Sequence, residues 1–343
     1  MGRRLLTLVL AAALCLSGCD WMDGSYVSVT PHQVSPGQAG ESNTASVSGY
    51  TELRSALVRM VDEGSTEGRF TLEGYPRETA EADLQRAVAY VTEVYPIGAY
   101  AVEAIEKSMG ANAVSVDITY RHTRQELDQI RTVRGMEDAG KAITEALEEC
   151  ADKLVLQVSG YRAADYTQIV RAYAQLYPDR VMEVPSVVPR TFPNQGDLRV
   201  VELLFYYKTD RETLRSMRQQ VQPVFSSAAL YVTGQASEET KFSQLHAFLM
   251  ERFEYKLQYS QTPAYSLLCE GVGDSRAFSQ VYAAMCQRIG LEARTISGTQ
   301  NGEKHWWNQI LLEDQWYHLD LTVPGPFTPM TDGELTGYEW DRE

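Results

Sequence analysis

The sequence predicts an α+β protein with two repeated α/β units and a C-terminal domain in which helices pack on an antiparallel sheet. The first observation is an internal echo. Residues 69–96 and 113–127 are followed, in the same order, by the similar segments 154–178 and 199–214. The second observation is a change of pattern from Ser237 onwards, where two amphipathic helical segments precede three strand-like segments.

The N-terminus resembles a secretory signal. Gly2-Arg3-Arg4 is basic, residues 5–16 are largely apolar, and Leu16-Ser17-Gly18-Cys19 closes the segment. The apolar run is shorter than the ~20 residues that a membrane-spanning helix needs. Its end resembles a bacterial lipobox, which implies a signal peptide over residues 1–18 and a lipid on Cys19. We expect an exported lipoprotein anchored to the outer face of the cytoplasmic membrane. Residues 19–48, rich in Ser, Gly, Thr and Pro, are expected to form a flexible tether.

Composition limits the function classes. After residues 1–18 are removed, 325 residues remain, enough for two or three domains of ~100–200 residues. The formal charge of −15 argues against nucleic acid and against electrostatic attraction to anionic lipid. Beyond Cys19 the cysteines are odd in number, so at least one is free or bonded to another chain; they are Cys150, Cys269 and Cys286. No cofactor is indicated, and no metal site is expected because ligand spacing is lacking among His32, His122, His246, His305 and His318.

The two repeats are predicted over residues 49–135 and 138–223. Their Gly-Tyr pairs, which begin at Gly74 and Gly160, lie 86 residues apart. Each copy is expected to contain helix, strand, Gly-Tyr turn, helix, strand and helix. One strand alternates, with one face formed by Val114, Val116, Ile118 and Tyr120. No phosphate loop and no cluster of His, Cys and carboxylates occurs in either copy. The many tyrosines are more typical of core edges than of a glycan or peptide surface.

The C-terminal domain is predicted over residues 237–343. Ser237 suits the N-cap of a helix. A second helix, 275–289, has an apolar stripe and ends at Gly290, where a glycine C-cap belongs. Strands are expected over residues 292–298, 305–313 and 315–323, with a turn at Glu313-Asp314.

Residues 237–325 resemble the transglutaminase-like superfamily, which has a papain-like core. The resemblance rests on motifs in the right order: Leu245-His246 to Phe253-Glu254-Tyr255, a Gly-rich loop and a helix ending in Gly290-Leu291, Ser297-Gly298, His305-Trp306-Trp307-Asn308, and Trp316 to Thr322. It implies a cysteine that attacks an acyl carbonyl, a histidine that takes its proton and an aspartate that orients the histidine.

By motif the histidine is His305 and the aspartate is Asp320, with Trp306, Trp307 and Asn308 in the wall of the cleft. If the turn is centred on residues 313–314, Trp307 lies opposite Asp320. His305 is then one diagonal away on the same face, within side-chain reach. A shift of one residue would place the pair on opposite faces.

The nucleophile position departs from the family pattern. The family's cysteine stands about fifteen residues before the terminal glycine of its helix, and counting back from Gly290 leads to Ser275. Cys269 has the familiar Cys-Glu-Gly text but lies 21 residues before Gly290. Placing it at the helix start would put Gly271 and Gly273 inside the helix, where glycine is unfavourable.

Two functions follow from this departure. We favour a pseudoenzyme in which Ser275 only caps the helix, because a serine hydroxyl is harder to activate than a thiol. Such a domain would bind peptide, glycan or an envelope protein. The alternative is an active hydrolase or acyltransferase on peptide amides, with Ser275 or Cys269 as nucleophile, His305 as base and Asp320 as orienting group. Likeness of residues 273–277 to lipase or esterase motifs is not favoured, because no hydrophobic strand precedes them.

Overall fold

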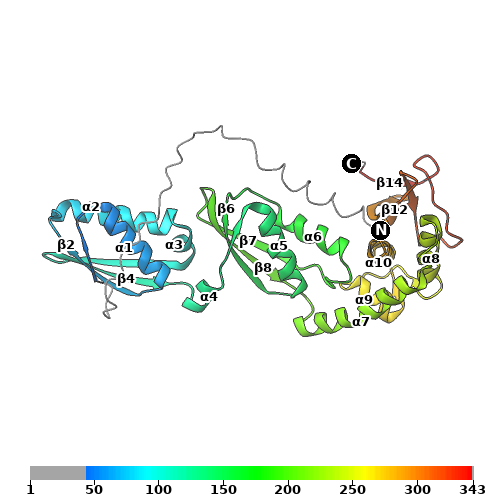
Figure 1. The fold of residues 1–343 in the computed structure, drawn as a ribbon, viewed down its shortest axis with the longest axis horizontal. Helices are drawn as coiled ribbons and strands as arrows, with labels where there is room; N and C mark the ends of the chain where they lie inside the picture. The colour runs from blue at the N-terminus through cyan, green and yellow to red at the C-terminus, as the bar shows by residue number, and fades with distance from the viewer. Residues whose placement is uncertain (1–43, 342–343) are drawn as a thin grey trace, which may run out of the picture. The chain divides into compact units, whose positions relative to one another are not determined.

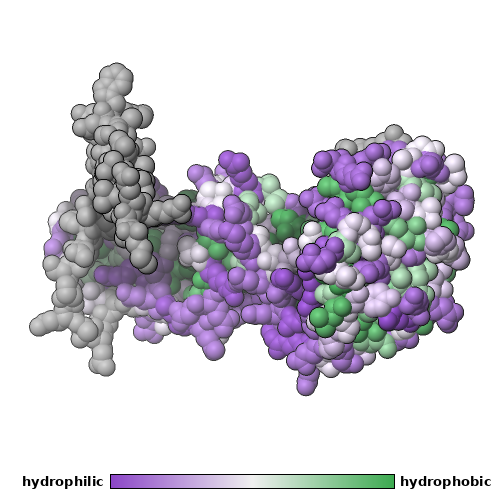
Figure 2. All heavy atoms as spheres, turned by 45° about the vertical axis from the view of Figure 1, so that its right-hand side comes forward, coloured by the Kyte–Doolittle hydropathy of each residue, from purple (hydrophilic) through white to green (hydrophobic). Residues whose placement is uncertain are grey.

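The computed structural model describes residues 44–341, which Figure 1 shows in colour. The predicted signal peptide, Cys19 and most of the predicted tether lie outside these residues. No helix within residues 44–341 is both long and apolar enough to cross a membrane. On the face drawn in Figure 2, hydrophilic residues predominate and hydrophobic ones lie between them.

The first sheet has four strands in the order β1-β2-β4-β3. β1 and β2 are parallel, and the other neighbours are antiparallel. The elements of this part are β1 (Thr44–Val47), α1 (Tyr50–Glu63), β2 (Glu67–Leu72), α2 (Arg77–Ala89), the π-helical turn η1 (Tyr90–Val94), α3 (Pro96–Ala101), β3 (Val102–Met109) and β4 (Ala113–Tyr120). The predicted alternation in β4 is confirmed, because Val114, Val116 and Ile118 are buried.

The second sheet has the corresponding order, β5-β6-β8-β7, and again only its first two strands are parallel. Its elements follow α4 (Arg124–Asp128) and are β5 (Arg131–Arg134), α5 (Gly135–Glu148), β6 (Lys153–Ser159), α6 (Tyr166–Leu176), β7 (Ser186–Phe192) and β8 (Leu198–Tyr206). Both sheets therefore run strand, helix, strand, helix, strand, strand, whereas the order predicted for each copy lacked the first and third of these strands.

Three predicted boundaries are wrong. The tether does not reach residue 48, because Thr44–Val47 pairs with β2 and Val47 is buried. The first unit does not reach residue 135, because Arg131–Arg134 pairs with β6 of the second sheet. The second unit does not reach residue 223, because Val221, Phe225 and Ala228 of α7 (Arg211–Tyr231) are buried in the C-terminal core.

The C-terminal part contains a third sheet, with the order β13-β12-β11-β14 and all neighbours antiparallel. A separate two-stranded sheet pairs β9 with β10. After α7 the elements are α8 (Glu238–Met250), β9 (Glu254–Tyr255), α9 (Pro263–Glu270), β10 (Val272–Gly273), α10 (Ser275–Arg288), β11 (Ala293–Gln300), β12 (Glu303–Leu312), β13 (Gln315–Leu319) and β14 (Tyr338–Glu339). Ser237 caps α8 as predicted, since its side chain accepts a hydrogen bond from the amide of Thr240.

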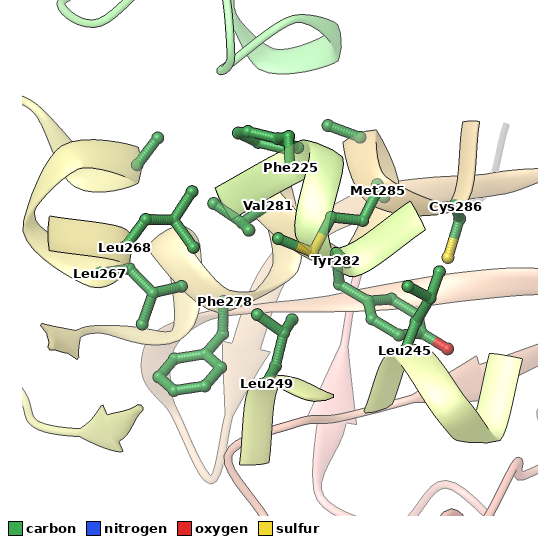
Figure 3. Packing of buried hydrophobic residues seen from close by; sticks show 14 of the residues in the cluster. Phe225, Leu245, Leu249, Leu267, Leu268, Phe278, Val281, Tyr282, Met285 and Cys286 are labelled. Atoms are coloured by element: carbon green, nitrogen blue, oxygen red, sulfur yellow. The ribbon is translucent and has the colours of Figure 1, made fainter. Parts of the chain in front are cut away.

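Helix α10 lies in the middle of the C-terminal core (Figure 3). Asp274 is its N-cap and accepts a hydrogen bond from the amide of Ala277 at 2.9 Å. Gly290 follows its end with φ of +79°, a backbone angle that favours glycine. The predicted apolar stripe is confirmed by the burial of Phe278, Val281, Tyr282 and Met285, which share one cluster with Leu245, Leu249, Leu267 and Leu268. This packing on α8 and α9 fixes the N-terminal end of α10.

Candidate functional site

The hairpin β12–β13 determines which residues meet at the candidate site. Its two turn residues, 313 and 314, both have positive φ, 49° and 62°, as a tight two-residue hairpin turn requires. Asn308 then pairs with Leu319. In this register Trp307 lies opposite Asp320, as the sequence predicts. The turn therefore places the histidine and aspartate of the motif on the same face.

His305 and Asp320 form a buried pair at this end of the sheet. Nε2 of His305 lies 2.7 Å from Oδ2 of Asp320, and each residue is 5% exposed. A carboxylate can only accept, so the imidazole proton belongs on Nε2 and the lone pair on Nδ1. Within the described residues, no hydrogen bond is made to Nδ1. The pair can therefore accept a proton or a donor group at Nδ1.

The carboxylate of Asp320 accepts from four donors. Oδ2 receives the hydroxyl of Tyr338 at 2.6 Å besides the imidazole. Oδ1 receives the amide of Thr322 at 2.8 Å and its hydroxyl at 2.7 Å. Burial acts to raise the pKa of Asp320, but the hydrogen bonds from His305, Tyr338 and the Thr322 amide outweigh it and lower this pKa. The group is therefore held in its ionised form.

Tyr338 is a member of the site that the sequence reasoning missed. It comes from β14, which pairs with the end of β11 so that Tyr338 lies opposite Gln300. This close pairing depends on Gly298, where a Cβ would lie 2.1 Å from the carbonyl oxygen of Glu339. Tyr338 and Trp340 alternate after a glycine, and this weak strand signal could have indicated β14. Nothing in the sequence pointed to Asp320 as the partner.

Ser275 is the first residue of α10 and is 3% exposed. The prediction that Ser275 caps the helix is wrong, because Asp274 fills that position and Ser275 already belongs to the first turn. Its Oγ instead accepts a hydrogen bond from the amide of Trp306 at 3.4 Å. Ser275 therefore lies beside the 305–306 peptide bond, at the strand that carries His305. No hydrogen bond joins its hydroxyl to the His305 ring, both residues being among those described.

Cys269 does not lie at the start of α10, in agreement with its spacing from Gly290. It belongs to α9, and the C-cap of that helix is Gly271, whose φ is +84°. The residue is exposed and its thiol is free. It stands at the C-terminal end of a helix, where the dipole disfavours a thiolate. Partial burial of the sulfur and the charge of Glu270 raise the pKa of this thiol. Both effects oppose a role as nucleophile.

The predicted cleft residues divide into two groups. Trp307 and Asn308 are fully buried, so their placement in the cleft wall is wrong. Trp307 donates to Nδ1 of His318 at 2.8 Å, and Asn308 donates to the carbonyl of Ser279 in α10 at 2.8 Å. The sheet is covered on both faces here, which explains why neighbours in one strand are both buried. Trp306 is partly exposed, with the Lys304 ammonium 4.8 Å from its ring centre.

An exposed apolar strip begins beside the site. Tyr255 pairs with Gly273, next to the α10 cap. Burial and the charges of Asp320 and Asp274 raise the pKa of Tyr255, which places its hydroxyl in their field. Leu257 and Tyr259 follow at alternate positions and are 83% and 71% exposed. Large apolar residues at such exposure suit a binding surface better than a core.

Within residues 44–341, no group of three or more His, Cys, Asp or Glu side chains could hold a metal ion. A cavity of about 1210 Å³ has Tyr95 and Phe192 in its lining. Neither His305 nor Asp320 lines this cavity. A much smaller cavity, about 80 Å³, lies next to Asp274 at the start of α10.

Comparison with known proteins identifies a family for the segment that contains the His305–Asp320 pair. Residues 226–321 match the family model of the transglutaminase-like superfamily. No curated protein matches the sequence. Solved structures that resemble the chain include a "TGase", at 13% identity and TM-score 0.28, covering 60% of this chain and 62% of that one. A "Putative Cysteine Protease" from Cytophaga hutchinsonii has 15% identity and TM-score 0.27, covering 45% of this chain and 70% of that one. A "putative protease" from Parabacteroides distasonis has 9% identity and TM-score 0.25, covering 51% and 40%.

The chain thus spans less than two thirds of the first of these structures. The matched segment begins within α7, before the predicted start at residue 237, and contains Ser275, His305 and Asp320, whereas Tyr338 lies beyond its end. The motifs predicted from the sequence, the helix-packed antiparallel sheet and the family match agree, and the C-terminal part of this chain is a transglutaminase-like domain.

Proposed function

We propose that the protein is an exported lipoprotein whose transglutaminase-like domain binds an extended peptide at the former cleft without performing acyl transfer. The proposed anchor is the lipid on Cys19, and the proposed location is the outer face of the cytoplasmic membrane. Both rest on the signal-like segment 1–18.

The main support for an inactive domain is the hydrogen bond between the Ser275 hydroxyl and the Trp306 amide. This hydroxyl accepts from the Trp306 amide and has no hydrogen bond to His305. A serine needs a base within hydrogen-bond reach before it can attack a carbonyl, because its hydroxyl is far less acidic than a thiol. What remains is a fixed acceptor, Nδ1 of His305, which suits the N–H group of a bound chain.

The apolar strip supports a peptide as the ligand. Tyr255, Leu257 and Tyr259 occur at alternate positions along one segment. Side chains of an extended peptide also alternate with a period of two residues. Such a peptide would present apolar side chains to the strip and backbone N–H groups to the His305 acceptor.

Peptide binding is tested with a library of acetylated heptapeptides and the full chain. We expect binding to fall about tenfold in Leu257→Asp, since burying a leucine side chain contributes about 1.5–3 kcal/mol. Leu230→Asp is the matched control, because Leu230 in α7 is 86% exposed and does not belong to the strip. Equal effects of both substitutions would contradict the proposed surface. Selective binding of a glycan array or an envelope protein in place of peptides would overturn the peptide assignment.

Inactivity is tested with a fluorophosphonate probe, which we expect to leave Ser275 unlabelled in the folded protein. The retained His305–Asp320 pair beside α10 favours one second candidate, an acyl hydrolase or acyltransferase with Ser275 as nucleophile. Labelling of Ser275 that disappears in His305→Ala would establish that candidate and refute the inactive site. A thiol-reactive acyl probe that labels Cys269 in a His305-dependent manner would support the Cys269 variant instead.

A further inference from the structure

Tyr338 connects the C-terminal strand with the His305–Asp320 pair. Its hydroxyl donates to Oδ2 of Asp320, the same oxygen that receives Nε2 of His305. Its ring packs edge-on against the His305 ring, with 6.0 Å between the ring centres, and against the Trp307 ring at 5.1 Å. The tyrosine therefore contacts both members of the pair.

The direction of the tyrosine hydrogen bond is fixed by a third residue. The side-chain amide of Gln300 donates to the Tyr338 oxygen. With that acceptor position used, the hydroxyl proton is directed to Asp320. Gln300 and Tyr338 are also opposite each other in the β11–β14 pairing, so backbone and side chain fix the same contact.

The carboxylate is held against rotation from both sides. Tyr338 occupies Oδ2, while the amide and hydroxyl of Thr322 occupy Oδ1. The Thr322 hydroxyl also lies 3.5 Å from Nε2 of His305, where it would compete for the imidazole if the carboxylate turned away. An orienting carboxylate works by holding one imidazole tautomer, so its own orientation must be held as well.

We propose that Tyr338 is a positioning residue that fixes the Asp320 carboxylate and thereby keeps the His305 proton on Nε2 and the lone pair on Nδ1. The site is then completed by a two-residue strand, β14, that lies outside the segment matching the family. The role concerns the pair itself and applies whether the cleft binds or reacts, so it does not depend on the proposed function.

The first test reads the tautomer directly in the full chain. ¹⁵N spectra of the histidines, assigned with His305→Gln, report which ring nitrogen carries the proton. We expect the native protein to show the Nε2–H form of His305 alone and Tyr338→Phe to show a mixture of both forms. The matched control is Tyr317→Phe, because within residues 44–341 the Tyr317 hydroxyl forms a hydrogen bond with Gln315 alone, at 3.3 Å. An unchanged spectrum in folded Tyr338→Phe would refute the proposal.

A milder variant keeps the test valid if Tyr338→Phe fails to fold. Gln300→Leu leaves the tyrosine in place but frees its hydroxyl to rotate, so the same mixture is expected at a lower fraction. If that variant also keeps only the Nε2–H form, the positioning role is wrong. Neither measurement uses a ligand, so a failure to bind peptide cannot be mistaken for a failure of this inference.

A second readout uses a thiol placed at the nucleophile position. In Ser275→Cys combined with Cys269→Ser, the rate of alkylation by iodoacetamide reports how well His305 stabilises the thiolate. Adding Tyr338→Phe is expected to slow alkylation by about tenfold, the effect of losing one hydrogen bond to a charged group, and to change the pH profile of the rate. Adding Tyr317→Phe should leave both unchanged. Equal rates with and without Tyr338→Phe would overturn the proposal.

Discussion

Replacing Asp320 by asparagine perturbs the most densely hydrogen-bonded group of the site. An asparagine side chain has nearly the same shape but only one acceptor oxygen and an NH₂ group in place of the other. If the oxygen stays with the two Thr322 donors, the NH₂ group faces Nε2 of His305 and the hydroxyl of Tyr338, which are both donors. With the native proton positions on His305 and Tyr338 retained, the substitution therefore converts two hydrogen bonds into two donor–donor contacts.

The magnitude follows from those two contacts. A hydrogen bond to a charged group contributes about 1.5–3 kcal/mol to stability. Removing the buried charge relieves part of its desolvation and offsets a share of the loss. We therefore expect Asp320→Asn to lower the free energy of unfolding of the C-terminal domain by about 2–4 kcal/mol at pH 7.

Tryptophan fluorescence in a guanidinium titration measures this effect selectively. The tryptophans among the described residues all lie in the C-terminal domain, at positions 306, 307, 316 and 340. A Trp21→Phe background removes the remaining tryptophan.

The pKa of Asp320 is lowered by folding, so its carboxylate contributes stability above the ordinary pKa of 3.8. This contribution is lost as the pH falls through the lowered folded pKa. The two proteins should therefore converge in acid. Equal stability at pH 7 would refute the reasoning.

Three further predictions concern other parts of the domain. Gly298→Ala is expected to detach β14 and lower the free energy of unfolding by about 1–3 kcal/mol, because the new Cβ would lie 2.1 Å from the Glu339 carbonyl oxygen. Amide hydrogen exchange at Tyr338 should become faster, and unchanged protection of that amide would contradict the prediction. Phe278→Ala is expected to cost about 3–5 kcal/mol, since Phe278 is fully buried; guanidinium denaturation measures the loss. A disulfide reagent should label Cys269 in folded protein, and peptide mapping should find Cys150 and Cys286 unlabelled, because both are buried and burial raises the pKa of each thiol.

Local signals in the sequence determined much of the C-terminal domain. Ser237 marked the start of α8, and the apolar stripe of α10 identified its buried face. The turn at residues 313–314 was sufficient to place His305 near Asp320, because a hairpin of fixed turn length has one register and side chains alternate along it. These features depend on residues that are close in the chain.

Only the tertiary structure decided what surrounds that pair. Tyr338 reaches Asp320 from a strand 18 residues further along, and no local pattern encodes such a contact. Trp307 and Asn308 appeared to be cleft residues, but they are buried because other segments cover both faces of the strand. The domain boundaries were misplaced for the same reason, since the short strands β1 and β5 are defined by their partners.

The nucleophile position shows both contributions. Counting along the sequence led to Ser275, because helix length is a local property, and the structure has α10 begin at that residue. The chain fold then decided that Asp274 caps the helix, that Cys269 belongs to a separate helix, and that the Ser275 hydroxyl meets the Trp306 amide. Spacing specifies where a side chain stands along its own helix, whereas the groups it meets depend on how distant segments pack against that helix.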